Sequence, residues 1–355
     1  PCESFWTESQ LVEGKCPDCG REAKPAKEEA YFFKMGKYAD RLIEHIQKHP
    51  EFIQPASRKN EMMNNFLLPG LQDLCVSRTS FKWGIPVDFD PKHVVYVWLD
   101  ALTNYITALG YPDDTELYDK YWPANVHLVG KEIVRFHSII WPAMLMSAGL
   151  PLPKQVLGHG WLLLGGEKVS KSKAAKAGDV VDPVVLIDRY GIDALKYFLL
   201  REYTFGQDGV FTNEVMLKRM NYDLANDLGN LVSRTVSMIE KYCGGKIPAA
   251  TTNDEIDDDL KAIATGAAAK VEAQMDKFAF NMALEEIWIL VRRANKYIDE
   301  KAPWVLAKDE AKKAELDTVM HNLAEAIRII SVLIYPFMHT TSKEIRKQMG
   351  LWYAD

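Results

Sequence analysis

Long hydrophobic runs are missing from this sequence of 355 residues. No uninterrupted apolar stretch reaches the length of about 18 residues that a membrane-spanning helix needs. The amino-terminal stretch PCESFWTESQ has no basic region followed by an apolar one, so it lacks the pattern of a secretory signal peptide. We therefore expect a cytoplasmic protein with no membrane partner.

A broad excess of positive charge is also lacking. Lysine and arginine number 43 against 49 aspartates and glutamates, a formal net charge of -6, and the balance is similar in the two halves of the chain. Proteins that hold nucleic acid mainly through phosphate contacts present a basic field. Any contact with nucleic acid is therefore expected to be local.

Cysteine is scarce, with five residues in the chain, but Cys16 and Cys19 form a close pair in GKCPDCGRE. Their spacing is that of a metal knuckle, and Gly20 after them lets backbone N–H groups approach the sulfurs. One pair is half of a site, and Cys2 is a candidate member of a second pair that begins before Pro1. A structural zinc site, a redox pair and free thiols are the interpretations left open.

Apolar residues make up 48% of the chain, enough for a large core and two or three domains. Residues 1–79 are expected to form an irregular polar module with one helix. That helix is KMGKYADRLIEHIQKH, in which an apolar face keeps a helical spacing. The face consists of Met35, Tyr38, Leu42 and Ile46.

Strand and helix patterns alternate in residues 80–211. The β-branched run from His93 to Trp98 passes into a helical pattern, and a second strand ends at Val129 before another helix. A third strand, in KQVLGHGWLLLGGEK, ends near Gly158 and leads into a hairpin around Gly165 and Gly166. This alternation predicts a parallel sheet covered by helices, with ligands beyond the carboxyl ends of its strands.

Residues 212–355 contain only helical patterns. Thr212 is the expected N-cap of a helix that Gly244 closes. A second helix is expected over 261–300, ended by Pro303, and a third over 316–350, bent at Pro336. The fold class is therefore α/β followed by an all-α helical bundle.

The stretch GGEKVSKSK places Lys168, Lys171 and Lys173 close together among glycines and serines. Alone, such a stretch is typical of a solvated surface loop. It follows the third predicted strand, however, which places its charge beside the expected ligand crevice.

Several blocks resemble known enzymes. KVSKS after a hairpin resembles the KMSKS signature of class I aminoacyl-tRNA synthetases, with Val169 in place of the usual methionine. VYVWLDALTNY, HLVGKEIVRFHSIIWPAML and DLANDLGNLVSR are similar to segments of methionyl-tRNA synthetases. The resemblance implies three parts: 1–79 as the remainder of a zinc-knuckle insertion, 80–211 as the second half of a Rossmann-like catalytic domain, and 212–355 as an anticodon-binding bundle.

The family's chemistry is the activation of L-methionine by ATP with Mg2+, followed by transfer to the 3′ end of tRNA(Met). The resemblance implies that Lys168 and Lys171 stabilise the charge that develops on the departing pyrophosphate. Ser170 and Ser172 lie in the same loop, and Arg78 corresponds to an arginine that organises the active site. A lysine suits moving phosphates because its flexible stem carries a point charge.

Two further sets of residues match binding positions of the family. The methionine pocket would be lined by Trp98, Ala101, Leu102, Tyr105, Ile133 and His137, with Leu102 in place of a proline found in some relatives. The ATP site would use Gly130, Glu132, Gly158 and His159 beside the loop lysines. Without the resemblance, a buried histidine such as His137 is more often satisfied by a neighbour in the core.

The helical half would read the anticodon. Asn230 and Arg234 are four residues apart and share one helix face, where they can reach unstacked base edges. Pro303 breaks the second helix and frees Trp304 to stack on a base. Apart from the resemblance, Trp304 would be assigned to core packing and Asn230 to a helix surface.

The H-x-G-H segment that binds ATP in class I enzymes is absent from these residues, and the chain begins with Pro1 instead of a methionine. We therefore expect the chain to begin inside the inserted domain of a longer protein, with the missing amino-terminal half as its partner. A tRNA-binding module without catalysis is the alternative. A class I synthetase for another apolar amino acid is the third hypothesis.

Overall fold

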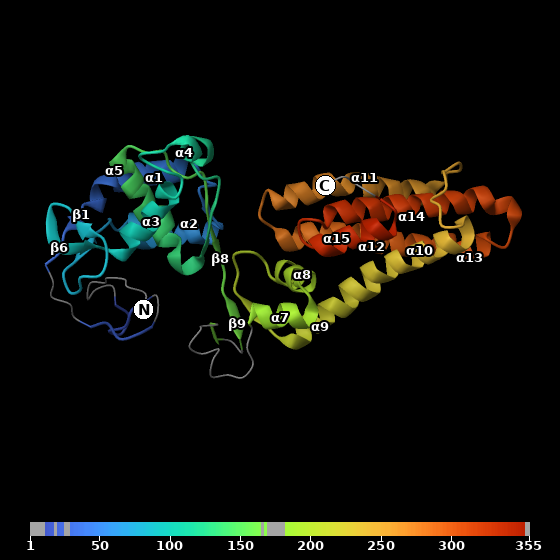
Figure 1. Cartoon of the computed structure of the whole chain (residues 1–355), viewed down its shortest axis with the longest axis horizontal. Coiled ribbons are helices and arrows are strands. Elements are labelled where there is room, and N and C mark those ends of the chain that lie inside the picture. Colours follow the sequence, from blue (N-terminus) through green and yellow to red (C-terminus); the bar gives the residue numbers. More distant parts are fainter. Residues whose placement is uncertain (1–10, 18–19, 25–28, 165–166, 169–181, 352–355) are drawn as a thin grey trace. The chain divides into compact units, whose positions relative to one another are not determined.

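The computed structural model describes residues 11–17, 20–24, 29–164, 167–168 and 182–351 (Figure 1). The chain divides into two compact units, Pro1–Gly160 and Trp161–Asp355. Among the described residues, no helix is both long and apolar enough to span a membrane.

The first unit contains a parallel sheet of three strands in the order β2 (Ile53–Gln54), β8 (Val156–His159) and β7 (His127–Gly130). The predicted parallel arrangement is confirmed for β7 and β8, which align Gly130 with His159 at their carboxyl ends. The strands are short, and their Ile53, Val129 and Val156 side chains are buried, whereas Leu128 and His159 are exposed. The buried core around the sheet consists of Leu42, Ile46, Phe52, Ile53, Met62, Leu67, Val129, Val134, Ile139 and Val156.

Helices from the predicted irregular module 1–79 take part in this core. The predicted helix is confirmed as a 3-10 turn, η2 (Met35–Tyr38), followed by α1 (Ala39–Lys48), and its Met35, Leu42 and Ile46 are buried. Strand β2, helix α2 (Ala56–Met62) and the π-helix η3 (Met63–Leu67) follow it. Residues 39–67 therefore pack on the parallel sheet, and this part of the predicted irregular module belongs to the core of the first unit. The three predicted domain ranges themselves stay a prediction.

The first predicted strand does not join the parallel sheet, which corrects the expectation for residues 93–98. Strand β6 (Asp90–Val95) lies antiparallel between β4 (Ser77–Arg78) and β5 (Pro86–Val87). It ends at Val95, and Trp98 belongs to the first turn of α3 (Val97–Thr107). A β-branched run favours a strand but does not specify the direction of its partner. Strands β1 (Phe32–Phe33) and β3 (Leu74–Cys75) form a further antiparallel pair.

The remaining helices of the first unit lie before and after the second predicted strand in the sequence. Helix α4 (Glu116–Tyr121) precedes β7. After β7, the predicted long helix is confirmed in three consecutive segments, η4 (Lys131–Ile133), η5 (Phe136–Ile140) and α5 (Trp141–Ala148). Gly149 closes α5 in the left-handed conformation, at φ 70°.

The second unit begins with the predicted hairpin. Strand β9 (Leu162–Leu164) pairs antiparallel with β10 (Glu167–Lys168), and parallel with β11 (Gly209–Phe211). Gly165 and Gly166, which the sequence predicted to form the turn, lie outside the described residues. Between β10 and β11 the structure describes α7 (Pro183–Tyr190) and α8 (Ile192–Glu202).

The rest of the second unit is the predicted helical bundle (Figure 1). A continuous helix comprises α9 (Asn213–Arg219), the π-helix η6 (Met220–Gly229) and α10 (Asn230–Cys243). Thr212 caps it by accepting a hydrogen bond from the Val215 N–H, and Gly244 ends it with φ 61°, as predicted. Helices α10, α12 (Phe280–Lys301) and α14 (Lys313–Leu333) pack around a core that includes the fully buried Trp288.

The predicted single helix over 261–300 is wrong. The segment forms two packed helices, α11 (Glu255–Met275) and α12 (Phe280–Lys301), with a turn in which Phe278 has φ 55°. No glycine or proline marks this turn, so the helical periodicity gave no sign of it. The chain continues with α13 (Pro303–Leu306) and the 3-10 turn η7 (Glu310–Lys312). The bend predicted at Pro336 is a break between α14 and α15 (His339–Gln348).

Candidate functional site

A hydrogen bond joins Tyr105 and His137, two residues of the predicted methionine pocket. The His137 Nδ1–H donates to the Ile133 carbonyl at 2.9 Å, so the Nε2 is left to accept from the Tyr105 hydroxyl at 2.8 Å. Burial lowers the pKa of His137 and raises that of Tyr105. Both side chains are therefore uncharged near neutral pH, as an apolar ligand requires.

Further aromatic rings pack in the same core cluster as Tyr105. The Trp98 ring stacks on Phe136 with centroids 3.9 Å apart and planes at 19°. The Tyr105 ring centroid lies 4.3 Å from that of His127 and 6.2 Å from that of Trp141. The structure thus brings together three of the predicted pocket residues, Trp98, Tyr105 and His137, from two helices that are far apart in sequence.

Three residues of this cluster were not predicted: Phe136, Trp141 and His127. Phe136 and Trp141 lie on the segment that carries His137, and Trp141 is four residues from it. The spacing that grouped Ile133 with His137 would also have included Trp141. His127 lies on β7, and no periodic signal connects it with Tyr105, because a strand and a distant helix meet only in the fold.

Several buried polar atoms in or beside this cluster have no hydrogen-bond partner among the described residues. They are His127 Nε2, Trp141 Nε1, Ser138 Oγ and Tyr118 Oη. Burial, and then the repulsion that His137 would exert when both rings are protonated, lower the pKa of His127 to about 4. Mostly aromatic side chains with a few polar atoms are the composition typical of a small-molecule pocket.

The other predicted pocket residues lie on the same two segments. Leu102 is 1% exposed and packs with Trp122 and Trp141 in a second core cluster. Ala101 is exposed on α3, and Ile133 is half-buried on η4. Leu102 therefore supports the cluster from within the core.

The predicted ATP residues meet at the carboxyl edge of the parallel sheet. Gly130 and His159 are paired across β7 and β8, with Gly158 next to them. A Cβ on Gly158 would lie 2.5 Å from Val134 Cγ2, so only glycine allows this close approach to the helix. A Cβ on Gly130 would lie 2.5 Å from Glu132 Oε2, which places that carboxylate at the same edge.

Arg78 comes from the antiparallel sheet, where it pairs with Val94. Its guanidinium lies 5.4 Å from the Phe81 ring centroid, and Nη2 donates to Ser80 Oγ at 3.3 Å. Its predicted role in organising the active site stays a prediction.

Other predicted residues lie wholly or partly outside the described structure. They are Ser170, Lys171, Ser172, Cys2 and Cys19, while Lys168 is placed only by its backbone in β10. Cys16 is buried, and its carbonyl accepts from the Gly20 N–H at 2.8 Å in a turn where Gly20 has φ 68°. The described residues alone contain no group of three or more potential metal ligands.

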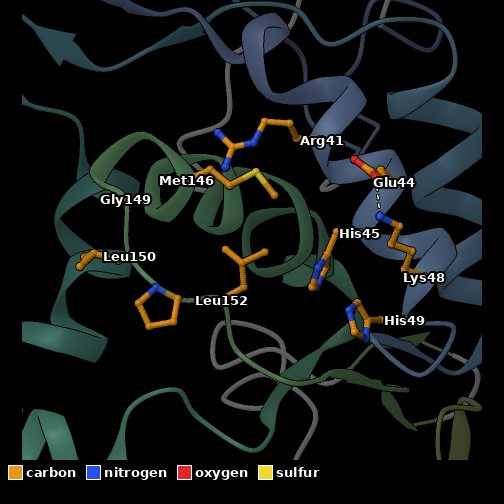
Figure 2. Close-up of a pocket in the computed structure, with 10 residues that line it drawn as sticks. Arg41, Glu44, His45, Lys48, His49, Met146, Gly149, Leu150 and Leu152 are labelled. Carbon is orange, nitrogen blue, oxygen red and sulfur yellow. Dashed lines mark hydrogen bonds and ion pairs between the residues drawn. The ribbon is translucent and has the colours of Figure 1, made fainter.

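A separate cavity of 420 Å³ lies between α1 and the loop after α5 (Figure 2). It shares His45, His49 and Leu152 with a neighbouring cavity that reaches Val126 and Gln155, the residues just before β7 and β8. These cavities therefore lie at the amino ends of the parallel strands. Ligands of such sheets bind at the opposite, carboxyl ends, so these cavities are not the candidate active site.

The predicted anticodon residues lie on α10 and at the end of α12. Asn230 is exposed in the first turn of α10, and the Arg234 guanidinium pairs with Asp299 Oδ1 of α12 at 2.8 Å. Pro303 is buried at the start of α13, whereas Trp304 is 43% exposed. The exposure of Trp304 leaves its indole able to stack on a ligand, in contrast to a core tryptophan.

Residues 1–236 match the family model described as tRNA synthetases class I (M), and residues 247–355 match the anticodon binding domain of methionyl tRNA ligase. The chain belongs to the methionyl-tRNA synthetase family. Its fold is accordingly the catalytic fold of a class I synthetase followed by an anticodon-binding domain. The fold class inferred from the sequence is thereby confirmed.

Solved structures of methionyl-tRNA synthetases agree along the chain. The Mycobacterium tuberculosis enzyme in complex with methionyl-adenylate matches with a TM-score of 0.91 and 44% identity, over 97% of this chain and 68% of that one. The apo form of the same enzyme matches with a TM-score of 0.88 and 42% identity, over 96% and 68%.

Curated methionine–tRNA ligases are similar over almost the whole chain. The protein from Clostridium perfringens is 64% identical over 351 residues, which cover 99% of this chain and 54% of that relative. The protein from Bacillus subtilis is 57% identical over 366 residues, 99% of this chain and 54% of its own. The chain thus spans about half the length of the curated relatives it matches.

Proposed function

We propose that the complete protein is a methionine–tRNA ligase that activates L-methionine with ATP and esterifies tRNA(Met) with it in the cytoplasm. This chain supplies the methionine pocket, the KMSKS-type loop and the anticodon-reading bundle. The observation that carries the proposal is the uncharged Tyr105–His137 pair within aromatic walls. A similar solved structure is described as a complex with methionyl-adenylate.

The pocket suits an unbranched thioether. Trp98, Tyr105 and Phe136 offer ring faces and edges, and sulfur makes favourable contacts with aromatic rings. The Tyr105 hydroxyl commits its proton to His137, so no charge and little donor capacity face the ligand. Ala101 and Ile133 would complete the proposed site as its aliphatic part, with Leu102 packed behind them in the core.

ATP with Mg2+ is the proposed co-substrate. We place it against Gly130, Gly158 and His159, with Glu132 at the same edge. Lys168 and Lys171 would meet the β- and γ-phosphates, while Ser170 and Ser172 keep the loop small enough to close. Charge develops on the leaving pyrophosphate, so the ammonium groups stabilise the transition state more than the ground state. Arg78 would organise the same site.

A structural zinc ion is proposed for the cysteine segment. Thiolates are preferred zinc ligands, and the glycine turn after the buried Cys16 has the backbone form that a knuckle needs. Cys2, Cys16 and Cys19 are the proposed ligands from this chain. Metal analysis of the purified protein should give one zinc, and Cys16→Ser should remove it.

Anticodon recognition is assigned to Asn230, Arg234, Pro303 and Trp304. The exposed Asn230 amide can bond a base edge, and the exposed Trp304 ring can stack on a splayed base. Pro303 sets the direction of the chain between α12 and Trp304. The partner of this bundle is therefore tRNA(Met).

Methionine-dependent exchange between ATP and pyrophosphate, measured on the complete protein, tests the proposal. We expect exchange with L-methionine and far less with L-isoleucine, because a β-branched side chain clashes in a pocket shaped for a linear one. The 355-residue chain alone should show none, since it contains no H-x-G-H segment. A complete protein that binds tRNA(Met) but gives no exchange would be a binding module instead.

A further inference from the structure

The carboxyl end of α12 carries a buried ionic group that the proposed function does not use. Lys301, the last residue of the helix, has a side chain only 3% exposed, and its Nζ lies 2.5 Å from Asp254 Oδ2 and 3.1 Å from Asp257 Oδ1. Tyr297, one turn earlier, donates to Asp257 Oδ1 at 2.6 Å. Lys301, Asp254, Asp257 and Tyr297 are called the Lys301 cluster below.

The cluster joins two oppositely charged helix ends. Asp254 is the N-cap of α11, where it accepts from the Ile256 and Asp257 N–H groups. Carboxylates are favourable at an amino end and an ammonium group at a carboxyl end. Burial alone would lower the pKa of Lys301, but its hydrogen bonds to Asp254 and Asp257 raise it, so the lysine stays charged.

The segment just after Lys301 is strained. Ala302 has φ 44°, in the left-handed region that side-chain-bearing residues seldom adopt. Such a residue persists only where its surroundings hold it. On its carboxyl side, Pro303 is buried and the Val305 N–H donates to the Ala302 carbonyl at 2.7 Å. On its amino side, Lys301 is the residue fixed to another helix.

We infer that Lys301 is a positioning residue for nucleic-acid recognition. By tying the end of α12 to the start of α11, it holds Ala302 in its left-handed conformation and so sets the direction in which Trp304 presents its indole. The ligand is an unstacked base of an RNA loop. The inference depends on the proposed function, in which Trp304 stacks on the anticodon.

A buried charge pair is a weak source of stability, since its desolvation offsets much of the attraction. Its use here is geometric, because a lysine held by two carboxylates cannot slide or rotate as an apolar side chain can. Lys296 offers a matched control. It lies on the same helix with a side chain 71% exposed, and it pairs only with Glu300 of that helix, at 3.2 Å, among the ion pairs of the described residues.

Binding of this chain to a fluorescent RNA hairpin, the anticodon stem-loop of tRNA(Met), tests the inference by anisotropy. Lys301→Met should raise the dissociation constant about tenfold, the size expected when one base loses its stacking partner. Lys296→Met should leave it within about twofold. Adding Lys301→Met to Trp304→Ala should raise the dissociation constant little further, because both substitutions remove the same contact between the indole and the base. The inference would be overturned if Lys301→Met left the dissociation constant unchanged, or if the losses of binding free energy in the two single variants added fully in the double variant.

A second measurement needs no RNA. With 5-fluorotryptophan incorporated, the fluorine signal of Trp304 is identified by its loss in Trp304→Ala. Lys301→Met should shift or broaden this signal, and Lys296→Met should not. An unmoved signal in Lys301→Met would contradict the positioning role. If the wild-type chain does not bind the hairpin, the proposed anticodon role fails, while the fluorine result still decides the positioning role.

A gentler variant covers the case in which Lys301→Met does not fold. Asp254→Asn keeps Asp257 as a partner for the lysine, and the Asp254 side chain is 49% exposed. We expect a smaller shift of the Trp304 signal and a smaller loss of hairpin affinity. A folded Asp254→Asn chain with both readouts at wild-type values would count against the inference.

Discussion

His127 and His137 are both buried, with ring centroids 5.8 Å apart, beside the proposed methionine pocket. Burial lowers the pKa of each, and that of His127 reaches about 4. The unfolded chain would take up these protons near pH 6.5. Folding therefore favours the neutral rings, and the pocket keeps no charge that would have to be desolvated by an apolar ligand.

The stability of the first unit should consequently depend on pH. The pKa values of both histidines are lower in the folded chain than in the unfolded chain. The stability that the two neutral rings contribute is therefore present above about pH 6.5 and is lost as the pH falls toward the folded pKa values. Urea unfolding should show stability falling from pH 7 to 5, where carboxylates stay ionised. His127→Leu should make this fall shallower, and the exposed His159→Gln should not. If the free energy of unfolding fell equally steeply with pH in wild type and His127→Leu, the lowered pKa of His127 would not be the cause.

Tyr105→Phe tests the hydrogen bond itself. The change leaves the buried His137 Nε2 without its donor, and an unsatisfied buried group costs about 1–3 kcal/mol. We expect the methionine KM in pyrophosphate exchange by the complete protein to rise about tenfold. Tyr121→Phe, at an exposed tyrosine of α4, is the control. A wild-type KM in Tyr105→Phe would exclude the pair from methionine binding.

Among the elements, β8 and the start of the helix after β7 approach so closely that glycine is required. Gly158→Ala should destabilise the first unit by about 1–3 kcal/mol, because its Cβ would lie 2.5 Å from Val134 Cγ2. Adding Val134→Ala should recover part of the loss in urea unfolding. Gly266→Ala, at an open position within α11, should be neutral or stabilising. If Gly158→Ala caused no loss of stability, the segment that carries Val134 would have to move to accommodate the added methyl group.

The KMSKS-type loop gives a prediction at the same scale. Lys171→Ala in the complete protein should lower the rate of adenylate formation strongly and leave methionine affinity nearly unchanged, because the charge acts mainly in the transition state. Lys173→Ala removes a lysine of the same loop and should have a much smaller effect. Equal losses of rate and methionine affinity in Lys171→Ala would contradict its role.

For the whole molecule, the proposed pocket and the anticodon residues belong to separate units of the chain. Trp304→Ala should therefore weaken charging of tRNA(Met) by about tenfold, the loss of one stacked base, and leave pyrophosphate exchange intact. Both reactions are measured on the complete protein. Loss of exchange in Trp304→Ala would show that the residue stabilises the fold instead of binding tRNA.

The sequence by itself determined those features of this protein that depend on residues close together in the chain. The N-cap Thr212, the closing Gly244 and the apolar face of α1 were predicted because capping and periodicity depend on neighbours in the chain. Motif order likewise pointed to the family that the comparisons establish. Of the pocket, the sequence suggested Trp98, Tyr105 and His137, through the resemblance.

Only the tertiary structure decided which distant segments meet. It placed β6 in an antiparallel sheet, packed residues 39–67 on the parallel one, and turned the chain at Phe278 without glycine or proline. It also set His127 against Tyr105, and Lys301 against Asp254. Strand direction and side-chain partners depend on contacts between residues far apart in sequence, and such contacts leave no local pattern.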